Sequence, residues 1–459
     1  MNILFTHGYF LQEDKKESLI MRPYVPLGIL YVSAFLEVNG YDNEIFDSTF
    51  SDFNSLIEKI RNYKPAIIAI YTNLMTKLNV LNIIRLIKND ESLKKIKIVL
   101  GGPEVKNHAQ NFLMFGADII VFGEGEATML ELVACIEQNK SYKEVEGIAF
   151  KNEQQEFITT ASRSLNKEID TRPFPNRKKI DLNLYLQAWK ERHGYNAINV
   201  STMRGCPYTC KWCSRAVYGQ TYRRRKPSLV VDEIISLQKE YSFDYIWFVD
   251  DVFTISHKWL EQFAAEVDLR KVTIQYECIS RADRLNEDVI KLLKKSGCFR
   301  VWIGAESGSQ KIIDAMDRRV DVQQTRDMIQ LVKRHGIKAG TFIMLGYPGE
   351  TEKDIVETIN HLKLSLPDEF TITVTYPIKG TPLYAEMEKD FLTHFPWESA
   401  TDREIDFART FPRRYYDYAV SWVVNEVNAK KNAMLGNYGA AMLCKIASYK
   451  QQINMLRWR

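Results

Sequence analysis

The strongest constraint on the fold is a regular alternation of short apolar runs and amphipathic stretches over the first 150 residues. Each run has the length of a buried strand, and each following stretch repeats its apolar residues at helical spacing. Alternation of this kind indicates a parallel sheet wound on both faces. The sequence therefore predicts an α/β, Rossmann-like doubly wound sheet at residues 1–150, with strand–helix pairs at 3–6 and 27–38, 44–47 and 53–62, 66–71 and 78–88, 96–100 and 105–115, and 118–122 and 127–136.

A second alternation follows an irregular segment. Residues 151–195 are expected to form a linker, because apolar periodicity fades over 161–195. Residues 147–160, at its start, are expected to form two short strands around a polar turn, and the basic run 177–179 is interpreted as a solvated face. Six strand–helix units are expected over residues 196–377, fewer than the eight of a closed barrel. Their candidate strands are 197–202, 245–249, 273–278, 300–303, 339–345 and 369–375.

The last segment, residues 378–459, departs from this pattern and is predicted to be helical. Residues 413–427 carry apolar side chains at amphipathic spacing, and a second helix is expected at about 438–455. We expect this region to cap the open side of the barrel and to shape a substrate pocket.

Composition excludes several classes of function. The chain has 459 residues, 45% of them hydrophobic and 26% charged, which predicts two or three globular domains. A net charge of +4 is too small to argue for a nucleic-acid partner. No apolar stretch approaches the roughly 20 residues that span a bilayer, and no signal peptide is seen, so a cytoplasmic setting with reduced thiols is expected. Four scattered cysteines are expected to be buried small hydrophobes: Cys135, Cys278, Cys298 and Cys444.

The other three cysteines lie within eight residues, at Cys206, Cys210 and Cys213. This spacing, in a chain without an export signal, indicates a metal or iron–sulfur site rather than disulfides. Closed zinc sites and fully ligated 4Fe–4S clusters need four protein ligands, so three thiolates leave one metal position open. A zinc site that borrows a distant ligand such as His193 is the alternative.

The spacing Cys206-x3-Cys210-x-Trp212-Cys213, on a loop after an apolar strand, resembles the signature of the radical S-adenosylmethionine (SAM) enzymes. The resemblance implies a 4Fe–4S cluster on the three cysteines, SAM bound at the fourth iron, and one-electron cleavage of SAM to a 5'-deoxyadenosyl radical. It also implies an external reductant such as ferredoxin or flavodoxin, and a partial (β/α)6 TIM-like barrel at residues 196–377.

Residues that follow the barrel strands are candidates for SAM binding, because active sites lie at the carboxyl ends of barrel strands. Arg281 can pair with the SAM carboxylate, while Glu306 or Asp250 can accept hydrogen bonds from its ammonium or ribose. By resemblance, Trp212 and the Gly346–Gly349 turn lie on the adenine side. A helix N-cap is the alternative for the acidic residues, Asp251 included. The run Arg223 to Lys226 either forms a solvated loop or meets an anionic group on SAM, cobalamin or substrate.

The strands of the first domain also end in small or polar residues, where ligands of doubly wound sheets collect. The candidates are Thr6, His7, Gly8, Thr72, Asn73, Gly101, Gly102, Gly123, Glu124 and Gly125. Ordinary strand-to-helix turns explain any single one of these ends. Together with the segment 26–31, they resemble the cobalamin-binding domain that precedes the barrel in one radical SAM subclass.

One feature of the wider cobalamin-binding family is missing from this chain. There is no Asp-x-His-x-x-Gly motif, since Phe5 stands two residues before His7. That motif supplies the histidine that ligates cobalt from below. Its absence implies a cobalamin without a histidine on its lower face, or a domain that has lost the cofactor; His7 as lower ligand is the minor alternative.

The order of domains and the motifs together are similar to cobalamin-dependent radical SAM enzymes. The first hypothesis is a methyltransferase that acts on an unactivated carbon of a small-molecule substrate. The second is an oxidative or ring-forming reaction, as in the anaerobic magnesium-protoporphyrin monomethyl ester cyclase. The third is a non-catalytic cobalamin- or metal-binding protein. A methylthiotransferase is disfavoured, because its leading domain needs three cysteines and this one has only Cys135.

Overall fold

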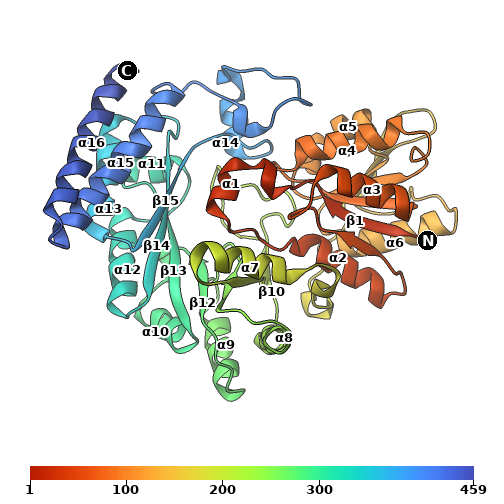
Figure 1. Ribbon diagram of the computed structural model, residues 1–459, viewed down its shortest axis with the longest axis horizontal. Helices are drawn as coiled ribbons and strands as arrows, with labels where there is room; N and C mark the ends of the chain where they lie inside the picture. The colour runs from red at the N-terminus through yellow and green to blue at the C-terminus, as the bar shows by residue number, and fades with distance from the viewer.

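A computed structural model describes residues 1–459. Figure 1 shows two α/β lobes side by side, with the N-terminal lobe in red and orange and a helical hairpin in blue at the opposite end. No helix is long and apolar enough to cross a membrane. The α/β fold class predicted from the sequence is confirmed by the sheet topology and by the solved structures described below.

The N-terminal lobe is built on a seven-stranded sheet, sheet A, in the order β2-β1-β3-β4-β5-β6-β7. Because β1 pairs with both β2 and β3, the chain switches direction there, and ligand crevices of doubly wound sheets form at such points. The parallel strands are β1 (Ile3–His7), β2 (Glu44–Phe46), β3 (Ile67–Tyr71), β4 (Lys97–Gly101) and β5 (Ile119–Val121).

Helices cover both faces of sheet A, and each face has its own apolar core. One core packs the sheet against α3 (Phe53–Tyr63), α4 (Lys77–Asn89) and α5 (Val105–Phe115). The other packs it against α2 (Leu27–Val38) and α6 (Gly125–Glu137). A short helix, α1 (Lys15–Ile20), lies between β1 and α2.

The segment expected to be a linker is more structured than its sequence indicates. The two short strands expected at residues 147–160 are confirmed as β6 (Ile148–Lys151) and β7 (Phe157–Thr159), which extend sheet A in antiparallel order. A helix that the periodicity analysis missed, α7 (Leu182–His193), buries Tyr185 and Trp189. The expectation of a solvated face at residues 177–179 is wrong for Arg177, which is buried between Glu233 and the carbonyl oxygen of Asn199.

The second lobe is built on six parallel strands, sheet B, in the order β15-β14-β13-β12-β11-β8. The end strands β15 and β8 do not pair, so the barrel stays open. The strands are β8 (Ala197–Val200), β11 (Tyr245–Phe248), β12 (Tyr276–Ser280), β13 (Cys298–Glu306), β14 (Lys338–Leu345) and β15 (Glu369–Val374). The helices around them are α8 (Pro227–Glu240), α9 (His257–Leu269), α10 (Glu287–Lys295), α11 (Gln310–Ala315), α12 (Val322–Arg334) and α13 (Glu352–Ser365).

The C-terminal segment begins with α14 (Pro382–Met387) and ends in a hairpin of two long helices, α15 (Arg413–Met434) and α16 (Tyr438–Leu456). Helix α15 packs on α13 and on the β14–β15 edge through Tyr415, Tyr416 and Val423. Figure 1 places this hairpin at the outer edge of the barrel, far from sheet A. Residues 388–411, between α14 and α15, reach back to the N-terminal lobe instead, where Lys77 of α4 donates to the carbonyl oxygen of Ala400.

The isolated cysteines divide into two groups. Cys278 and Cys298 are buried in the barrel core, as expected. Cys135 and Cys444 are only half-buried, because each lies on the outer part of its helix, so the expectation of full burial is wrong for them.

We predict that Glu233→Ala destabilises the barrel strongly. Glu233 is 1% exposed and pairs with Arg177 Nη1 at 2.6 Å and Arg225 Nη1 at 2.5 Å. Removing the carboxylate leaves two buried guanidinium groups uncompensated, so the free energy of unfolding should fall by about 3–5 kcal/mol in urea denaturation. The exposed Glu261→Ala on α9 is the matched control. A change no larger than that of the control would contradict this prediction.

Candidate functional site

The loop that carries the three clustered cysteines is closed at its base by a short ladder. Strand β9 (Met203–Arg204) precedes the loop and pairs antiparallel with β10 (Arg223–Arg224), which follows it. Gly205 turns into the loop at φ +84°, and a Cβ there would lie 2.5 Å from the carbonyl oxygen of Thr221. Only glycine fits this turn, so the two ends of the cysteine loop are held tightly together.

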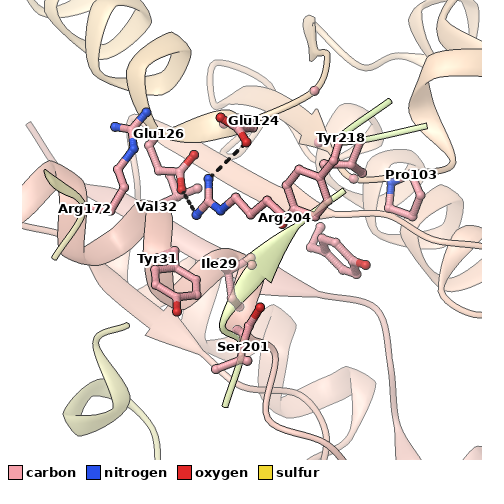
Figure 2. A pocket seen from close by; sticks show the side chains of 18 of the residues that line it. Ile29, Tyr31, Val32, Pro103, Glu124, Glu126, Arg172, Ser201, Arg204 and Tyr218 are labelled. Carbon is pink, nitrogen blue, oxygen red and sulfur yellow. Dashed lines mark hydrogen bonds and ion pairs between the residues drawn. The ribbon is translucent and has the colours of Figure 1, made fainter. Parts of the chain in front are cut away.

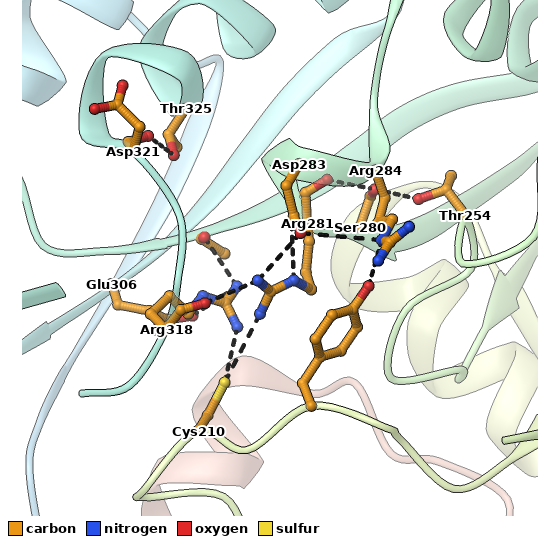
Figure 3. A network of polar contacts seen from close by, with 12 residues as sticks. Cys210, Thr254, Ser280, Arg281, Asp283, Arg284, Glu306, Arg318, Asp321 and Thr325 are labelled. Atoms are coloured by element: carbon orange, nitrogen blue, oxygen red, sulfur yellow. Dashed lines mark hydrogen bonds and ion pairs between the residues drawn. The ribbon is translucent and has the colours of Figure 1, made fainter. Parts of the chain in front are cut away.

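Cys210, the most buried of the three cysteines, faces two cationic groups. Cys210 Sγ is 3.6 Å from Arg318 Nη1 and 3.8 Å from Arg281 Nη1, and Figure 3 shows both guanidinium groups converging on it. Burial raises the pKa of Cys213 to about 12, and Asp251 and the other two cysteines add to the increase. Burial likewise raises the pKa of Cys206.

An iron–sulfur cluster at this loop would be held by thiolate ligands. The structure brings no group of three or more His, Cys, Asp or Glu side chains into metal-ligand geometry, these cysteines included. The chemistry of the loop nevertheless fits, because cluster ligands are thiolates and two guanidinium groups compensate negative charge at Cys210.

Arg281 and Glu306, two predicted site residues, belong to one buried network with Arg318. Arg281 Nε donates to Asp283 at 2.8 Å, its Nη2 donates to the carbonyl oxygen of Arg318 at 2.8 Å, and its guanidinium stacks on Tyr208 at 3.8 Å. Glu306 lies 3.5 Å from Arg318 Nη2. Burial raises the pKa of Glu306, while Arg318 and Arg281 act in the opposite direction.

Glu306 itself has an unusual backbone conformation. It has φ +63° at the end of β13, where the pairing with β14 shifts register between Gly304 and Glu306. Strained non-glycine residues of this kind gather at functional sites. Sequence reasoning missed Arg318 altogether, because it lies in a turn after α11 and ends no strand.

Asp250 is buried at the end of β11, and both of its carboxylate oxygens interact with other groups of the protein. It accepts hydrogen bonds from the backbone N–H of Thr202 at 2.7 Å and of Met203 at 3.2 Å, and it lies 3.6 Å from Arg224 Nη2. The side chain thus ties β11 to the start of the cysteine loop. Asp251 is not a helix cap, since Ser256 caps α9 by accepting from Trp259 N–H.

Trp212 and the Gly346–Gly349 turn lie close together at the barrel mouth. Trp212 packs against the cluster of buried side chains that includes Tyr347 and Met316, and Arg318 lies 5.7 Å from its ring. Gly346 has φ +75° and donates its N–H to Glu350 at 2.6 Å; Gly349 has φ +80° with no atom near its Cβ position.

A cavity of about 340 Å³ lies between the two lobes, at the carboxyl ends of the strands of sheet A. Phe5, Val99 and Val121 of the sheet and Ile29 of α2 form its apolar side, while Asp250 and Gly205 reach it from the barrel. Figure 2 shows Ile29, Tyr31 and Glu124 on the side of the first lobe and Ser201 and Arg204 on the side of the barrel. Of the predicted cobalamin contacts, five line it: Gly101, Gly102, Gly123, Glu124 and Gly125.

The glycines of this cavity leave space for a ligand. A Cβ on Gly28 or Gly101 would meet no atom closer than 3.8 Å, so a side chain there would occupy the cavity. Gly102 serves the backbone instead, since its Cβ would lie 2.4 Å from the carbonyl oxygen of Thr72. An apolar cleft of this size with convergent polar groups at its mouth fits part of a large cofactor such as cobalamin.

The remaining predicted contacts of the first lobe lie outside this cavity. His7 and Asn73 line a second cavity of about 480 Å³, which shares Gly28 and Tyr71 with the first. Both ring nitrogens of His7 are engaged, Nε2 with Asp47 at 3.0 Å and Nδ1 with Ser48 Oγ at 3.0 Å. No ring nitrogen is left for a metal, which disfavours His7 as a cobalt ligand.

The other three predicted cobalamin contacts lie among protein groups. Thr6 donates to the carbonyl oxygen of Phe46, Gly8 packs against α4, and Thr72 is fully buried.

The run Arg223 to Lys226 is not a solvated loop, so that alternative is wrong for its arginines. Arg224 donates to the carbonyl oxygen of Phe253 at 2.6 Å and stacks on Trp259 at 3.5 Å. Arg225 pairs with Glu233, and only Lys226 is exposed.

Comparisons with known proteins agree with this arrangement. Residues 200–362 match the family model of the radical SAM superfamily, and residues 22–133 match that of the B12 binding domain. An uncharacterized methyltransferase of Pyrococcus horikoshii is 29% identical over 78% of this chain and 77% of its own length. The anaerobic magnesium-protoporphyrin IX monomethyl ester cyclase of Rubrivivax gelatinosus is 27% identical over 84% of this chain and 70% of its own length.

Solved structures share the fold. The cobalamin-dependent SAM radical enzyme OxsB has a TM-score of 0.76 at 15% identity, covering 98% of this chain and 72% of the other. The radical SAM methyltransferase TsrM of Kitasatospora setae has a TM-score of 0.71 at 16% identity, covering 86% of this chain and 79% of the other.

The chain is therefore a radical SAM enzyme, whose cofactors are a 4Fe–4S cluster and SAM. Because a B12-binding domain precedes the radical SAM domain, the chain belongs to the cobalamin-dependent members of this superfamily.

We predict that Glu350→Gln changes how stability depends on pH. Burial raises the pKa of Glu350 from 4.5 to about 8, so the folded state keeps this carboxyl protonated where the unfolded chain ionises it. The native stability should therefore fall as the pH rises from 4.5 to 8, by up to about 1.4 kcal/mol per pH unit. A glutamine keeps the acceptor for Gly346 N–H and cannot ionise.

The measurement is urea denaturation of both proteins at several pH values across that window. Glu350→Gln should match the wild type near pH 4.5 and be the more stable protein at pH 8. The exposed Glu388→Gln should follow the wild type throughout. Parallel pH profiles for wild type and Glu350→Gln would contradict the prediction.

Proposed function

We propose that this chain is a cobalamin-dependent radical SAM methyltransferase that transfers a methyl group to an unactivated carbon of a small molecule. The observation that carries the proposal is the cavity of about 340 Å³ between the lobes. It is lined by the strand ends of the B12-binding domain and, from the barrel, by Gly205 and Asp250 beside the cysteine loop. Cofactors bound in these two domains would therefore meet at one place, and methyltransferases are among the relatives.

We assign Cys206, Cys210 and Cys213 to the cluster. When bound, the cluster with SAM supplies a radical that can remove hydrogen from an unactivated carbon, and cobalamin supplies the methyl group. Arg281 and Arg318 would compensate the negative charge of the Cys210 thiolate, because both guanidinium groups point at its sulfur. Asp250 would fix the start of the loop through the Thr202 and Met203 amides.

The SAM contacts are assigned at the barrel mouth. Glu306 is 8% exposed and offers a carboxylate beside Arg318, so it suits an ammonium or ribose hydroxyl group. Trp212, Gly346 and Gly349 would form the adenine side, where the positive-φ glycines allow close approach to the backbone. Arg281 would reach the SAM carboxylate only by exchanging one of its present partners.

The lobes exclude water from the reaction. Apolar residues of sheet A and α2 line one side of the cavity, so charges inside interact more strongly than in bulk water. One-electron cleavage also needs an external reductant, for which we propose a small redox protein of the ferredoxin or flavodoxin kind in the cytoplasm.

A second candidate function is an oxidative or ring-forming reaction. It is favoured by the magnesium-protoporphyrin monomethyl ester cyclases, which match 84% of this chain at 26–27% identity. The two candidates differ in their products. A methyltransferase forms S-adenosylhomocysteine as well as 5'-deoxyadenosine, whereas the second reaction has no need of S-adenosylhomocysteine.

We predict that the anaerobically reconstituted protein, given dithionite and SAM, forms 5'-deoxyadenosine, measured by liquid chromatography. Cys210→Ala should abolish its formation, because a 4Fe–4S cluster that keeps one iron free for SAM needs three thiolate ligands and only two would remain. Cys444→Ala, on the distant helix α16, is the matched control and should retain it. Absence of 5'-deoxyadenosine from the wild-type protein would refute both candidate reactions; its formation by Cys210→Ala would refute the cluster assignment.

A further inference from the structure

Four charged side chains join the two lobes at the base of the cysteine loop. Glu124 and Glu126 lie where β5 passes into α6, and Arg204 and Arg223 form the β9–β10 ladder. Arg223 Nη2 lies 2.6 Å from Glu124 Oε1, Arg204 Nη1 lies 3.5 Å from the same oxygen, and Arg204 Nη2 donates to Glu126 Oε1. We call these four residues the interlobe clamp; Figure 2 shows its contacts between Arg204 and both glutamates.

The clamp is shielded from solvent. The exposure of its side chains is between 4% and 10%. Tyr31 of α2 and Tyr218 of the cysteine loop lie 5.3 and 5.6 Å from the Arg204 guanidinium. Burial would raise the pKa of Glu126, but Arg204 outweighs it and holds that pKa below its usual value. Screening by salt is weak at such a site, so the four charges hold one another in a fixed geometry.

The position of the clamp connects both cofactor regions. Glu124, Glu126 and Arg204 all line the cavity between the lobes. Arg204 is followed directly by Gly205 and Cys206, and Gly205 packs so closely on Thr221 that a Cβ there would lie 2.5 Å from its carbonyl oxygen. Because Arg204 is only two residues from Cys206, we expect a displacement of Arg204 to displace Cys206 relative to the strand ends of the B12-binding domain.

We propose that Arg204 and Arg223 are positioning residues. Glu124 and Glu126 hold them, so that the cysteine loop keeps a fixed position relative to the strand ends of sheet A that line the cavity. The inference rests on the proposed function for its catalytic consequence. A cluster held by the cysteine loop would need only the barrel to cleave SAM. Transfer of the SAM methyl group to a bound cobalamin would need both lobes in their fixed relative position, so that transfer would depend on the clamp.

The first test needs no cofactor. Arg204→Gln, Glu126→Gln and the double variant are compared with the wild-type apoprotein in thermal unfolding. Each single variant leaves a buried charge without its partner, whereas the double variant removes both charges. We expect the double variant to lose clearly less in melting temperature than the sum of the two single losses. Additive losses would overturn the clamp, whatever the protein catalyses.

The second test separates the two uses of SAM. With cluster, cobalamin and dithionite present, Arg204→Gln should reduce S-adenosylhomocysteine formation by about 100-fold, as expected for reacting groups displaced by about 1 Å. The fold-reduction in 5'-deoxyadenosine formation should be at least ten times smaller than the fold-reduction in S-adenosylhomocysteine formation. Arg204→Lys, which keeps the charge, should restore part of the S-adenosylhomocysteine. The cluster's electron paramagnetic resonance spectrum should be unchanged, which shows that the loop still binds it.

Two outcomes of the second test would overturn the proposal. The first is an equal loss of S-adenosylhomocysteine and 5'-deoxyadenosine formation in Arg204→Gln, which indicates general damage to the fold. The second is no loss of either product. Wild-type protein that forms neither nucleoside would refute the proposed function instead. The melting experiment would then still decide whether the clamp couples the lobes.

Discussion

Parallel strands bring their carboxyl ends to one edge of a sheet, and this molecule uses that constraint twice. The strand ends of sheet A and those of the open barrel border the same cavity. Each lobe therefore contributes its loops at one place, although residues that meet there, such as Glu126 and Arg204, lie 78 positions apart in the chain. The remaining features of the site, from the cysteine loop to the glycine turns, are local consequences of that arrangement.

Buried arginines fix the details. Arg177 and Arg225 share Glu233 behind the first barrel strand, Arg224 joins Asp250 to the aromatic core, and Arg318 joins Glu306 to the cysteine loop. A buried guanidinium group costs free energy unless its donors are satisfied, so each of these side chains admits few geometries. They make the site rigid, and a rigid site suits a reaction whose radical must meet one carbon only.

Much of the fold could be predicted from the sequence because periodicity is a local property. The strand–helix alternation predicted both parallel sheets, and the cysteine spacing together with the strand-end residues indicated the cofactors. The failures have physical causes. Helix α7 was missed because its apolar stripe spans only about two turns and follows an irregular segment, although its four buried residues recur at helical spacing: Leu182, Tyr185, Leu186 and Trp189. The basic runs at 177–179 and 223–226 were misjudged because charge alone does not reveal a buried partner such as Glu233.

The sequence by itself determined the class of chemistry, because three cysteines within eight residues and small residues at strand ends are patterns in the chain. Only the tertiary structure decided which of these residues act together. It separated Gly101, Gly123 and Glu124, which line the cavity with Asp250, from Thr6 and Thr72, which do not. In the folded protein both ring nitrogens of His7 also have hydrogen-bond partners, and Arg318 lies next to the sulfur of Cys210. These relations depend on packing between distant segments, and no local pattern records them.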